Sequence, residues 1–258
     1  MENKLYTDLS NDDYHADKNS VSSSLVKKMA QSYSHAKYAK DNPSVSTASM
    51  ELGTVFHNLV LEPDDIQFLI MPEDINLRTK DGKAQKSEME LTGKLIIKQE
   101  VYDAAKLMTK SALSHPVASK LLTDGIAEQS IFWTENGLQR RCRPDYYKDN
   151  NIIDLKSAID ASPSGFAKAI ANFGYDIQQA FYEDGVNTQM DVQEFYFVVT
   201  ENKPPYLTGV YQIKYEHIAR ARLKYQDLLA GWQSCLEFDY YPGYSNEIVM
   251  LDLPKWHK

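Results

Sequence analysis

Cysteine is scarce in this sequence, which contains only Cys142 and Cys235 among its 258 residues. Two cysteines that lie far apart in a chain provide neither a disulfide framework nor a structural zinc site. We therefore expect both to be packed thiols in a protein of the reducing cytoplasm.

Long hydrophobic runs are also missing, although 43% of the residues are hydrophobic. No segment approaches the roughly 18 apolar residues that a membrane-spanning helix requires. The first residues, Met1–Leu5, lack the basic start and apolar centre of a signal peptide. We therefore expect no membrane partner, and a core large enough for one large domain or two small ones.

The sequence has no excess of basic residues, since 28 Lys and Arg stand against 36 Asp and Glu and give a net charge of -8. This balance does not exclude a nucleic-acid partner, because DNA contact requires only a local basic surface. An acidic exterior around a basic channel would give the same net charge.

The spacing of apolar and chain-breaking residues predicts helices on both sides of a central sheet, and hence a single α/β domain over residues 1–258. Helices are expected at residues 22–40, 46–61, 88–114 with a break at Thr92-Gly93, 164–172, 176–190 and 215–236. Strands are expected at 68–72, 194–200 and 208–213, and as an antiparallel meander at 127–133, 139–147 and 151–156. Residues 1–20 are expected to be extended and residues 76–87 to form an exposed, mobile loop. The tail, 240–258, is expected to pack through Tyr240, Tyr241, Tyr244 and Trp256 on the body or on a neighbouring subunit.

The centre of the sequence contains two acidic residues and a lysine that the fold is expected to bring together. Asp145 closes one apolar segment and Asp154-Leu155-Lys156 closes the next. Side chains alternate along a strand, so Asp154 and Lys156 share a face and Leu155 points into the core. A hairpin through 148–151 would place Asp145 beside them. Two neighbouring carboxylates repel unless a divalent cation lies between them, and oxygen ligands favour Mg²⁺ or Mn²⁺. This arrangement suits hydrolysis of a phosphodiester.

An acid-x-lysine triplet alone is a weak signal, because charged residues end many strands. Its context strengthens it, since a carboxylate after Ile152-Ile153 is costly unless it is used. Arg141 and Arg143 are expected on the same face as Asp145, where they are candidates for DNA contact. The alternative is that these arginines, with Arg140, simply pair with the acids.

Three further positions are candidates for the same site. His57 lies four residues after Gly53, so both share one helix face, and the imidazole is either a metal ligand or a core histidine. Gln178 and Tyr182 form a polar strip that either orients Lys156 and holds a DNA phosphate or is an ordinary amphipathic edge. Glu128 is a candidate outer ligand.

These motifs occur in the order Gly53-x3-His57, Glu128, Arg143-Pro144-Asp145, Asp154-Leu155-Lys156 and Gln178-x3-Tyr182. In that order the sequence resembles the RecB-like branch of the PD-(D/E)xK nucleases, and within it the RecE-type exonucleases (exodeoxyribonuclease VIII). Short segments of the sequence also match these enzymes from about Tyr14 to Trp256, although RecE carries a long additional N-terminal region.

The resemblance implies a central mixed β-sheet flanked by helices and a Mg²⁺ cofactor for which Mn²⁺ can substitute. It implies degradation of linear duplex DNA from the 5′ end to mononucleotides, which leaves a 3′ single strand. It further implies a single-strand-annealing partner protein, a ring-shaped homo-oligomer, tetrameric in the RecE case, and a phage or prophage origin in the cytoplasm of a bacterial host.

Carried over by position, the metal ligands are His57, Asp145, Asp154 and the backbone carbonyl of Leu155. Lys156 would position and help to deprotonate the attacking water, and Gln178 and Tyr182 would support the site and the DNA. From the residues themselves, Arg78, Lys80 and Lys83 are a candidate DNA clamp, or else a solvated loop. Ser22, Ser24 and Lys27 are candidates for holding a 5′ phosphate, or else a plain helix cap.

Two other functions stay open at this stage. One is a structure-specific endonuclease or single-strand nuclease of the same fold. The other is a DNA-end-binding module without catalysis, although degenerate copies of the site would be expected to lose Asp145, Asp154 or Lys156.

Overall fold

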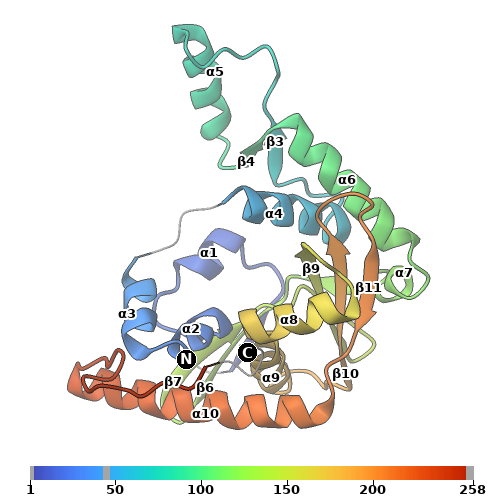
Figure 1. Ribbon diagram of the computed structural model, residues 1–258. Coiled ribbons are helices and arrows are strands. Elements are labelled where there is room, and N and C mark those ends of the chain that lie inside the picture. Colours follow the sequence, from blue (N-terminus) through green and yellow to red (C-terminus); the bar gives the residue numbers. More distant parts are fainter. Residues whose placement is uncertain (1–2, 43–46, 254–258) are drawn as a thin grey trace.

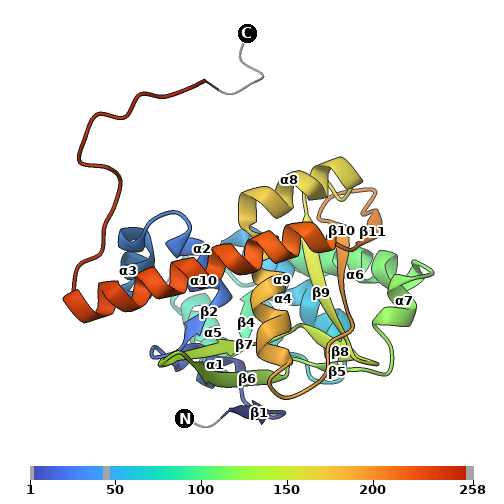
Figure 2. The same cartoon turned by 90° about the horizontal axis from the view of Figure 1, so that it is seen from below.

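The computed structural model describes residues 3–42 and 47–253 and has the expected α/β architecture (Figures 1 and 2). Its largest sheet has the strand order β11-β10-β9-β8-β5. These strands are β5 (Ile126–Ala127), β8 (Tyr146–Lys148), β9 (Asn151–Ala158), β10 (Glu194–Glu201) and β11 (Thr208–Tyr211). β9 and β10 are parallel, whereas the other neighbours are antiparallel. The prediction of a mixed sheet is therefore confirmed.

The parallel pair needs a crossover, which α8 (Pro163–Phe173) and α9 (Tyr175–Val186) supply. Side chains of β9 and β10 alternate between the two faces of the sheet. Ile152, Phe195 and Phe197 pack with α8, α9 and the long helix α10 (Tyr215–Phe238). Ile153, Leu155 and Val198 pack on the other face with α4 (Ala48–Leu61) and α6 (Gln99–Ser114). Leu155 is fully buried, as its position between Asp154 and Lys156 predicts.

The predicted three-stranded meander is wrong in two respects. Residues 127–133 divide into β5 and β6 (Ser130–Glu135), which belong to different sheets, with the left-handed Glu128 between them. Residues 139–147 do not form one strand either. They divide into β7 (Leu138–Cys142) and β8, which belong to different sheets. The second sheet has the order β1-β6-β7-β2, with β1 (Lys4–Tyr6), β2 (Val21–Ser22) and β6 (Ser130–Glu135). The physical cause of the second division is local, since Arg143-Pro144-Asp145 lies between β7 and β8 and proline donates no ladder hydrogen bond.

Both hairpin turns fall where the sequence predicts them. Asn136 and Gly137 join β6 to β7, and Asp149 and Asn150 join β8 to β9. All four residues have positive φ, the conformation that two-residue hairpin turns of type I′ require. The β8–β9 turn fixes the register that places Asp145 beside Asp154 and Leu155, in the middle of β9.

The N-terminal part of the chain is more structured than predicted. Residues 1–20 were expected to be extended, but they contain β1 and α1 (Asn11–Ala16). The helix expected over 22–40 is two helices, α2 (Ser23–Met29) and α3 (Tyr33–Asp41). Ser32 interrupts it because its hydroxyl accepts a hydrogen bond from the His35 N–H and so caps a new helix.

A projecting unit, which we call the arm, replaces the loop expected at residues 76–87. It consists of β3 (Phe68–Ile70), α5 (Lys80–Glu90) and β4 (Leu95–Ile97), and it extends away from the body (Figure 1). Thr79 caps α5 by accepting a hydrogen bond from the Gly82 N–H at 3.0 Å. The break expected at Thr92-Gly93 is confirmed, because α5 ends at Glu90 and Gly93 adopts a left-handed φ. The helix expected after that break starts later than predicted, because β4 pairs with β3 before α6 begins.

The tail follows the prediction only in part. Tyr241 packs against Trp232 of α10, and Tyr244 lies against His35 of α3. Tyr240 is exposed, and Trp256 lies outside the described residues. Beyond Tyr244 the chain leaves the body (Figure 2). The short α7 (Ala118–Leu121) completes the elements. In the part of the chain that the structure describes, no helix is long and apolar enough to cross a membrane.

Candidate functional site

Asp154 and Lys156 form an ion pair on one face of β9, as the alternation of strand side chains predicts. Asp154 is completely buried. Its Oδ1 accepts a hydrogen bond from Gln178 Nε2 of α9 at 2.7 Å, while Oδ2 faces the Lys156 ammonium. Burial and the nearby Asp145 raise the pKa of Asp154 to about 6, although Lys156 opposes the shift. The Lys156 cation and the Gln178 amide therefore offset the free-energy cost of burying the Asp154 carboxylate.

Asp145 reaches the same place from the segment between β7 and β8. Its Oδ2 accepts a hydrogen bond from the Leu155 backbone N–H at 2.7 Å. The carboxylate is thereby fixed at the middle of the Asp154-Leu155-Lys156 triplet. Burial raises the pKa of Asp145, while Lys156 and the Leu155 N–H oppose this. Burial also disfavours the charge of Lys156, but Asp154 and Asp145 outweigh it and keep the lysine pKa above its ordinary value.

His57 approaches this pair of acids from α4. Its Nδ1 lies 3.7 Å from Asp145 Oδ2. Gly53, one turn earlier, faces β9, where an added Cβ would lie 3.5 Å from Ser157 Oγ. Burial and the Lys156 charge lower the pKa of His57 to about 4. The imidazole is therefore neutral near pH 7, which is the form that binds a metal.

Glu128, predicted only as a candidate outer ligand, lies next to His57 and Asp145, and the three side chains form a group of possible metal ligands. Ligand atoms of His57, Glu128 and Asp145 all lie within 4.8 Å of one another. Glu128 has a left-handed φ of 51°, and its N–H donates to the Asp145 carbonyl at 3.1 Å, which turns it toward the other two. Burial and the repulsion from Asp145 raise the pKa of Glu128 to about 8. Two crowded carboxylates and a neutral imidazole fit a divalent cation, because such an ion would relieve that repulsion.

Lys27 of α2, predicted from the sequence as a candidate for holding a 5′ phosphate, contacts residues of the acid–lysine site. Its Nζ donates to Gln178 Oε1 at 3.2 Å. The Lys27 ammonium also lies 5.7 Å from the centre of the Tyr175 ring. The Lys156 ammonium, which comes from β9, lies 5.1 Å from the centre of the same ring. Burial and the neighbouring Lys156 lower the pKa of Lys27 to about 8. No local motif pointed to Lys27 or Tyr175 as partners of Asp154, because 151 residues separate Lys27 from Gln178.

A pocket of about 250 Å³ adjoins the candidate ligands. Its lining includes Glu128, Asp145, Tyr182, Arg141, Arg143, Ser22 and Ser24, together with residues of α1. Burial raises the pKa of Tyr182, so its phenol stays protonated. The structure thus brings Tyr182 and the two serines to the site. Ser22 also caps α2, since its hydroxyl accepts from the Leu25 N–H at 3.4 Å.

The arginines are not simply partners of the site acids. Arg141 and Arg143 lie over the buried Tyr14 ring at 4.7 and 4.3 Å. Arg141 bonds to the carbonyls of Tyr14 and Asp17, and Arg143 to those of Leu9 and Ser10. Arg140 pairs with Glu135. Arg141 and Arg143 therefore hold the N-terminal segment against the pocket, a role that no motif in the sequence predicted.

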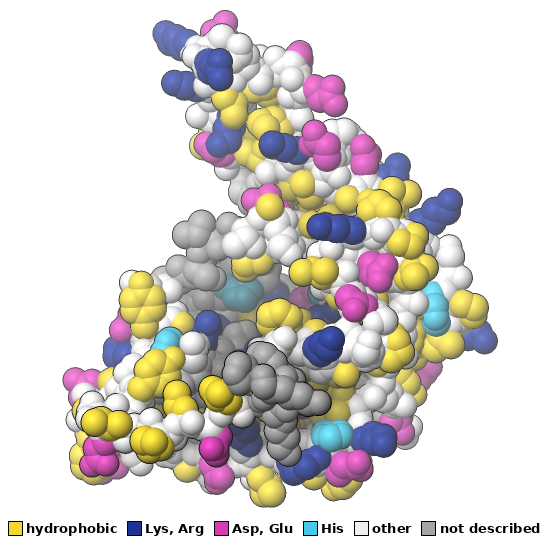
Figure 3. Space-filling view, in the orientation of Figure 1, with side chains coloured by type: hydrophobic (Ala, Val, Ile, Leu, Met, Phe, Trp, Pro, Cys, Tyr) yellow, Lys and Arg dark blue, Asp and Glu magenta, His cyan; other side chains and the backbone are white. Residues whose placement is uncertain are grey.

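The predicted clamp residues lie elsewhere in the molecule. Arg78, Lys80 and Lys83 are exposed on the arm, where Lys and Arg side chains stand at its tip (Figure 3). The arm projects from the side of α4 and α6 (Figure 1), so these residues are separate from the His57 cluster. Lys80 and Lys83 belong to the helix α5 rather than to the expected loop, and Arg78 lies in the turn before it.

Comparison with known proteins places this geometry in a family. A search of curated proteins gave no match. Among solved structures, the fold is similar to the crystal structure of a "Putative exonuclease" from Eubacterium rectale, with a TM-score of 0.66, 14% sequence identity and 96% of each chain covered. Residues 22–254 match the family described as a PDDEXK-like domain of unknown function, DUF3799. The chain belongs to this family, and it has the PD-(D/E)xK fold that its central sheet and acidic cluster display.

Proposed function

We propose that this protein is a Mg²⁺-dependent exonuclease that degrades linear double-stranded DNA from the 5′ end. The observation that carries the proposal is the convergence of His57, Glu128 and Asp145 within 4.8 Å, directly beside the Asp154–Lys156 ion pair. PDDEXK-like family membership supports nuclease chemistry at this position. Mn²⁺ is expected to substitute, since it favours the same oxygen and imidazole ligands.

Each residue of the site has a separate role in the proposed hydrolysis. His57, Glu128 and Asp145 would hold the metal, with Asp154 and the Leu155 carbonyl beside them. When bound, a divalent cation lowers the pKa of its water and shields the scissile phosphate. Lys156, held by Asp154, orients the attacking water and stabilises negative charge on the phosphate. Gln178 fixes Asp154, and Tyr182 faces the adjoining pocket, where it can contact the DNA strand.

The finer parts of the proposal extend the resemblance to RecE-type exonucleases. We infer mononucleotide products and 3′ single-stranded overhangs, which a single-strand-annealing protein would then use in phage-type recombination. The solved structure of similar fold is described as a "Putative exonuclease", and we extend that activity to this chain as part of the proposal.

The test is hydrolysis of linear duplex DNA labelled separately at its 5′ and 3′ ends, with Mg²⁺ or with EDTA, beside a covalently closed circle. Early release of 5′ label as mononucleotide, only with metal and only from the linear form, is the expected result. Cutting of the circle would instead establish an endonuclease. Metal-independent binding of DNA ends without product would establish a binding module.

A further inference from the structure

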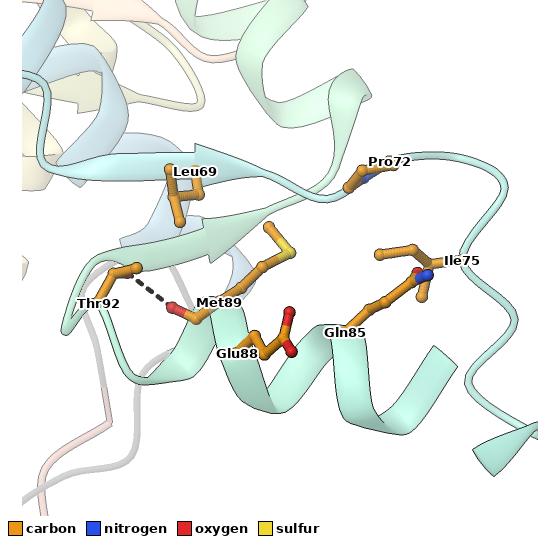
Figure 4. Close-up of a pocket in the computed structure, with 7 residues that line it drawn as sticks. All are labelled: Leu69, Pro72, Ile75, Gln85, Glu88, Met89 and Thr92. Atoms are coloured by element: carbon orange, nitrogen blue, oxygen red, sulfur yellow. Dashed lines mark hydrogen bonds between the residues drawn. The ribbon is translucent and has the colours of Figure 1, made fainter. Parts of the chain in front are cut away.

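The arm contains a groove of about 360 Å³ between α5 and β3, away from β9 (Figures 1 and 4). Its walls are mostly apolar, and Met89 points from the helix toward the strand (Figure 4). Among the described residues that line this groove, Glu88 is the only one with a charge, and a carboxylate repels a phosphate. The groove therefore does not suit a DNA strand. An exposed apolar surface that does adjoin the proposed catalytic centre lies at the corner between α8 and α9.

This corner consists of Phe173-Gly174-Tyr175 and lies beside α2 (Figures 1 and 2). Gly174 ends α8 and caps α9 with a left-handed φ of 63°, a conformation that suits glycine. A Cβ at this position would lie 3.2 Å from Cγ of Lys27, the lysine that bonds to Gln178. The corner is therefore packed closely against the residues that support Asp154.

A column of aromatic rings leads from the core to the corner. The ring of Phe197 on β10 lies 5.4 Å from that of Phe166 on α8, and the Phe166 ring stacks on Tyr175 with 5.9 Å between centroids. Phe166 and Phe197 are buried. Phe173, whose ring lies 5.7 Å from that of Tyr175, is 60% exposed. Phe173 is thus the solvent-facing end of a column of rings that the core holds in place.

The same column adjoins the proposed catalytic lysine. The Lys156 ammonium lies 5.1 Å from the centre of the Tyr175 ring, so Tyr175 is a neighbour of both Lys156 and Phe173. Successive nucleotides of a strand are about 3.4 Å apart. A strand whose phosphate is held at Lys156 therefore has bases within reach of the exposed Phe173 ring.

The depth of the site indicates that these bases are unpaired. Asp154 is completely buried, and the Lys156 side chain is only 16% exposed. A double helix is too wide to bring a phosphate to so buried a pair, whereas a single strand can enter. An unpaired base has lost its neighbours in the duplex and exposes its flat face, which stacks on aromatic side chains whatever the base.

We propose that Phe173 stacks on an unpaired base of the strand that is cut, next to the phosphate that Lys156 contacts. The ligand is a nucleobase of any identity in single-stranded DNA, and Tyr175 holds the Phe173 ring in position. This inference rests on the proposed function. It adds to that function a contact that binds the strand without selecting its sequence.

The test is binding of the full chain to a duplex with a short unpaired 5′ tail, with Ca²⁺ in place of Mg²⁺ so that DNA binding is measured without cleavage. Two tails of equal charge are compared, one of thymidine nucleotides and one of abasic nucleotides. Phe173→Leu keeps the apolar bulk but removes the aromatic face. Its affinity for the thymidine tail is expected to fall about tenfold, and its affinity for the abasic tail is expected to be unchanged.

Two further variants control this comparison. Phe173→Trp keeps an aromatic face and is expected to bind both tails as wild type does. Phe238→Leu is the matched control, because Phe238 is 72% exposed and is the last residue of α10. It is expected to leave both affinities unchanged.

Equal losses of affinity on both tails would show that Phe173 supports the fold or a phosphate contact, which overturns the proposal. Unchanged affinity on both tails would assign the exposed ring to another ligand, such as a protein, and also overturns it. The expected pattern in a protein that releases no nucleotide with Mg²⁺ would end the nuclease proposal and leave the stacking site standing. Wild type that binds neither tail would overturn both.

Discussion

At the scale of single residues, the site depends on a lysine held by a buried acid. Lys156→Gln keeps an amide donor beside Asp154 but removes the charge, so we expect cleavage to fall by about 10²–10³-fold, the usual loss for one donor to a developing anion. Asp154→Ala is expected to lose as much. The measurement is kcat on end-labelled duplex, with Lys168→Ala, an exposed lysine of α8, as the control. Normal kcat in Lys156→Gln would remove Lys156 from the mechanism.

Lys27 is expected to act through Gln178 rather than on DNA. Its bond to Gln178 Oε1 forces the amide to present Nε2 to Asp154. Losing a charged hydrogen bond costs about 1.5 kcal/mol, so Lys27→Met should lower kcat about tenfold. Because the role is positioning, KM for DNA should hardly change, and Lys27→Arg should restore part of the rate.

The neighbouring exposed Lys28 supplies the control for this experiment, as Lys28→Met. A Lys27→Met enzyme whose KM rises while kcat stays normal would show instead that Lys27 binds a phosphate of the DNA.

At the scale of elements, the arm is the part most clearly separated from the catalytic centre. Lys80 and Lys83 are exposed on α5, which lies on the arm away from β9 (Figure 1). If they contact DNA phosphates, Lys80→Ala with Lys83→Ala should weaken DNA binding and reduce the slope of log K against log salt by about 0.9 per lost contact. The rate at saturating DNA should not change.

Binding titrations at several salt concentrations measure this slope. Lys106→Ala with Lys110→Ala is the control, because both lysines are exposed on α6, away from the arm. An unchanged slope in the α5 variant would show that Lys80 and Lys83 are solvated and do not contact DNA.

At the scale of the whole molecule, the crowded acids couple stability to pH and metal. The pKa of Glu128 is about 8 in the folded protein, against an ordinary value of 4.5. The folded state therefore binds more protons than the unfolded state between these values, and stability falls as pH rises through them. Without metal, Tm should decline from pH 6.5 to pH 8, above the range in which the lowered pKa of His57 acts in the opposite direction.

Calorimetry across this range, with EDTA and with Mg²⁺, measures the effect. Added metal should raise Tm more at pH 8 than at lower pH, because the ion then displaces fewer protons from Glu128. Glu128→Gln should flatten the metal-free decline, while Glu100→Gln, at an exposed position of α6, should leave it unchanged. A metal-free Tm that rises with pH would contradict the assigned cluster.

Much of the fold followed from local signals in the sequence. Apolar spacing placed α4, α8, α9 and α10 to within a few residues, apart from an early end of α9 at Val186. The hairpin at Asp149-Asn150 and the alternation along β9 were enough to bring Asp145, Asp154 and Lys156 together. These features depend on neighbours in the chain, where steric and turn preferences act directly.

Other parts of the molecule required contacts between distant residues. The split of residues 139–147 between two sheets, the β3–β4 pairing that forms the arm, and the arginine contacts to α1 all join separate segments. Segments as short as β4 show little hydrophobic periodicity of their own. Their apolar residues were therefore assigned to the helix predicted over the neighbouring residues.

The sequence by itself determined the α/β class, the acid–lysine triplet and the order of motifs around it. Only the tertiary structure decided that Glu128 turns into the group of possible ligands, that Lys27 holds Gln178, and that the tail leaves the body. The reason is physical: strand alternation and turn chemistry are set by adjacent residues, whereas burial, and the pKa shifts it causes, depends on which distant surfaces pack together.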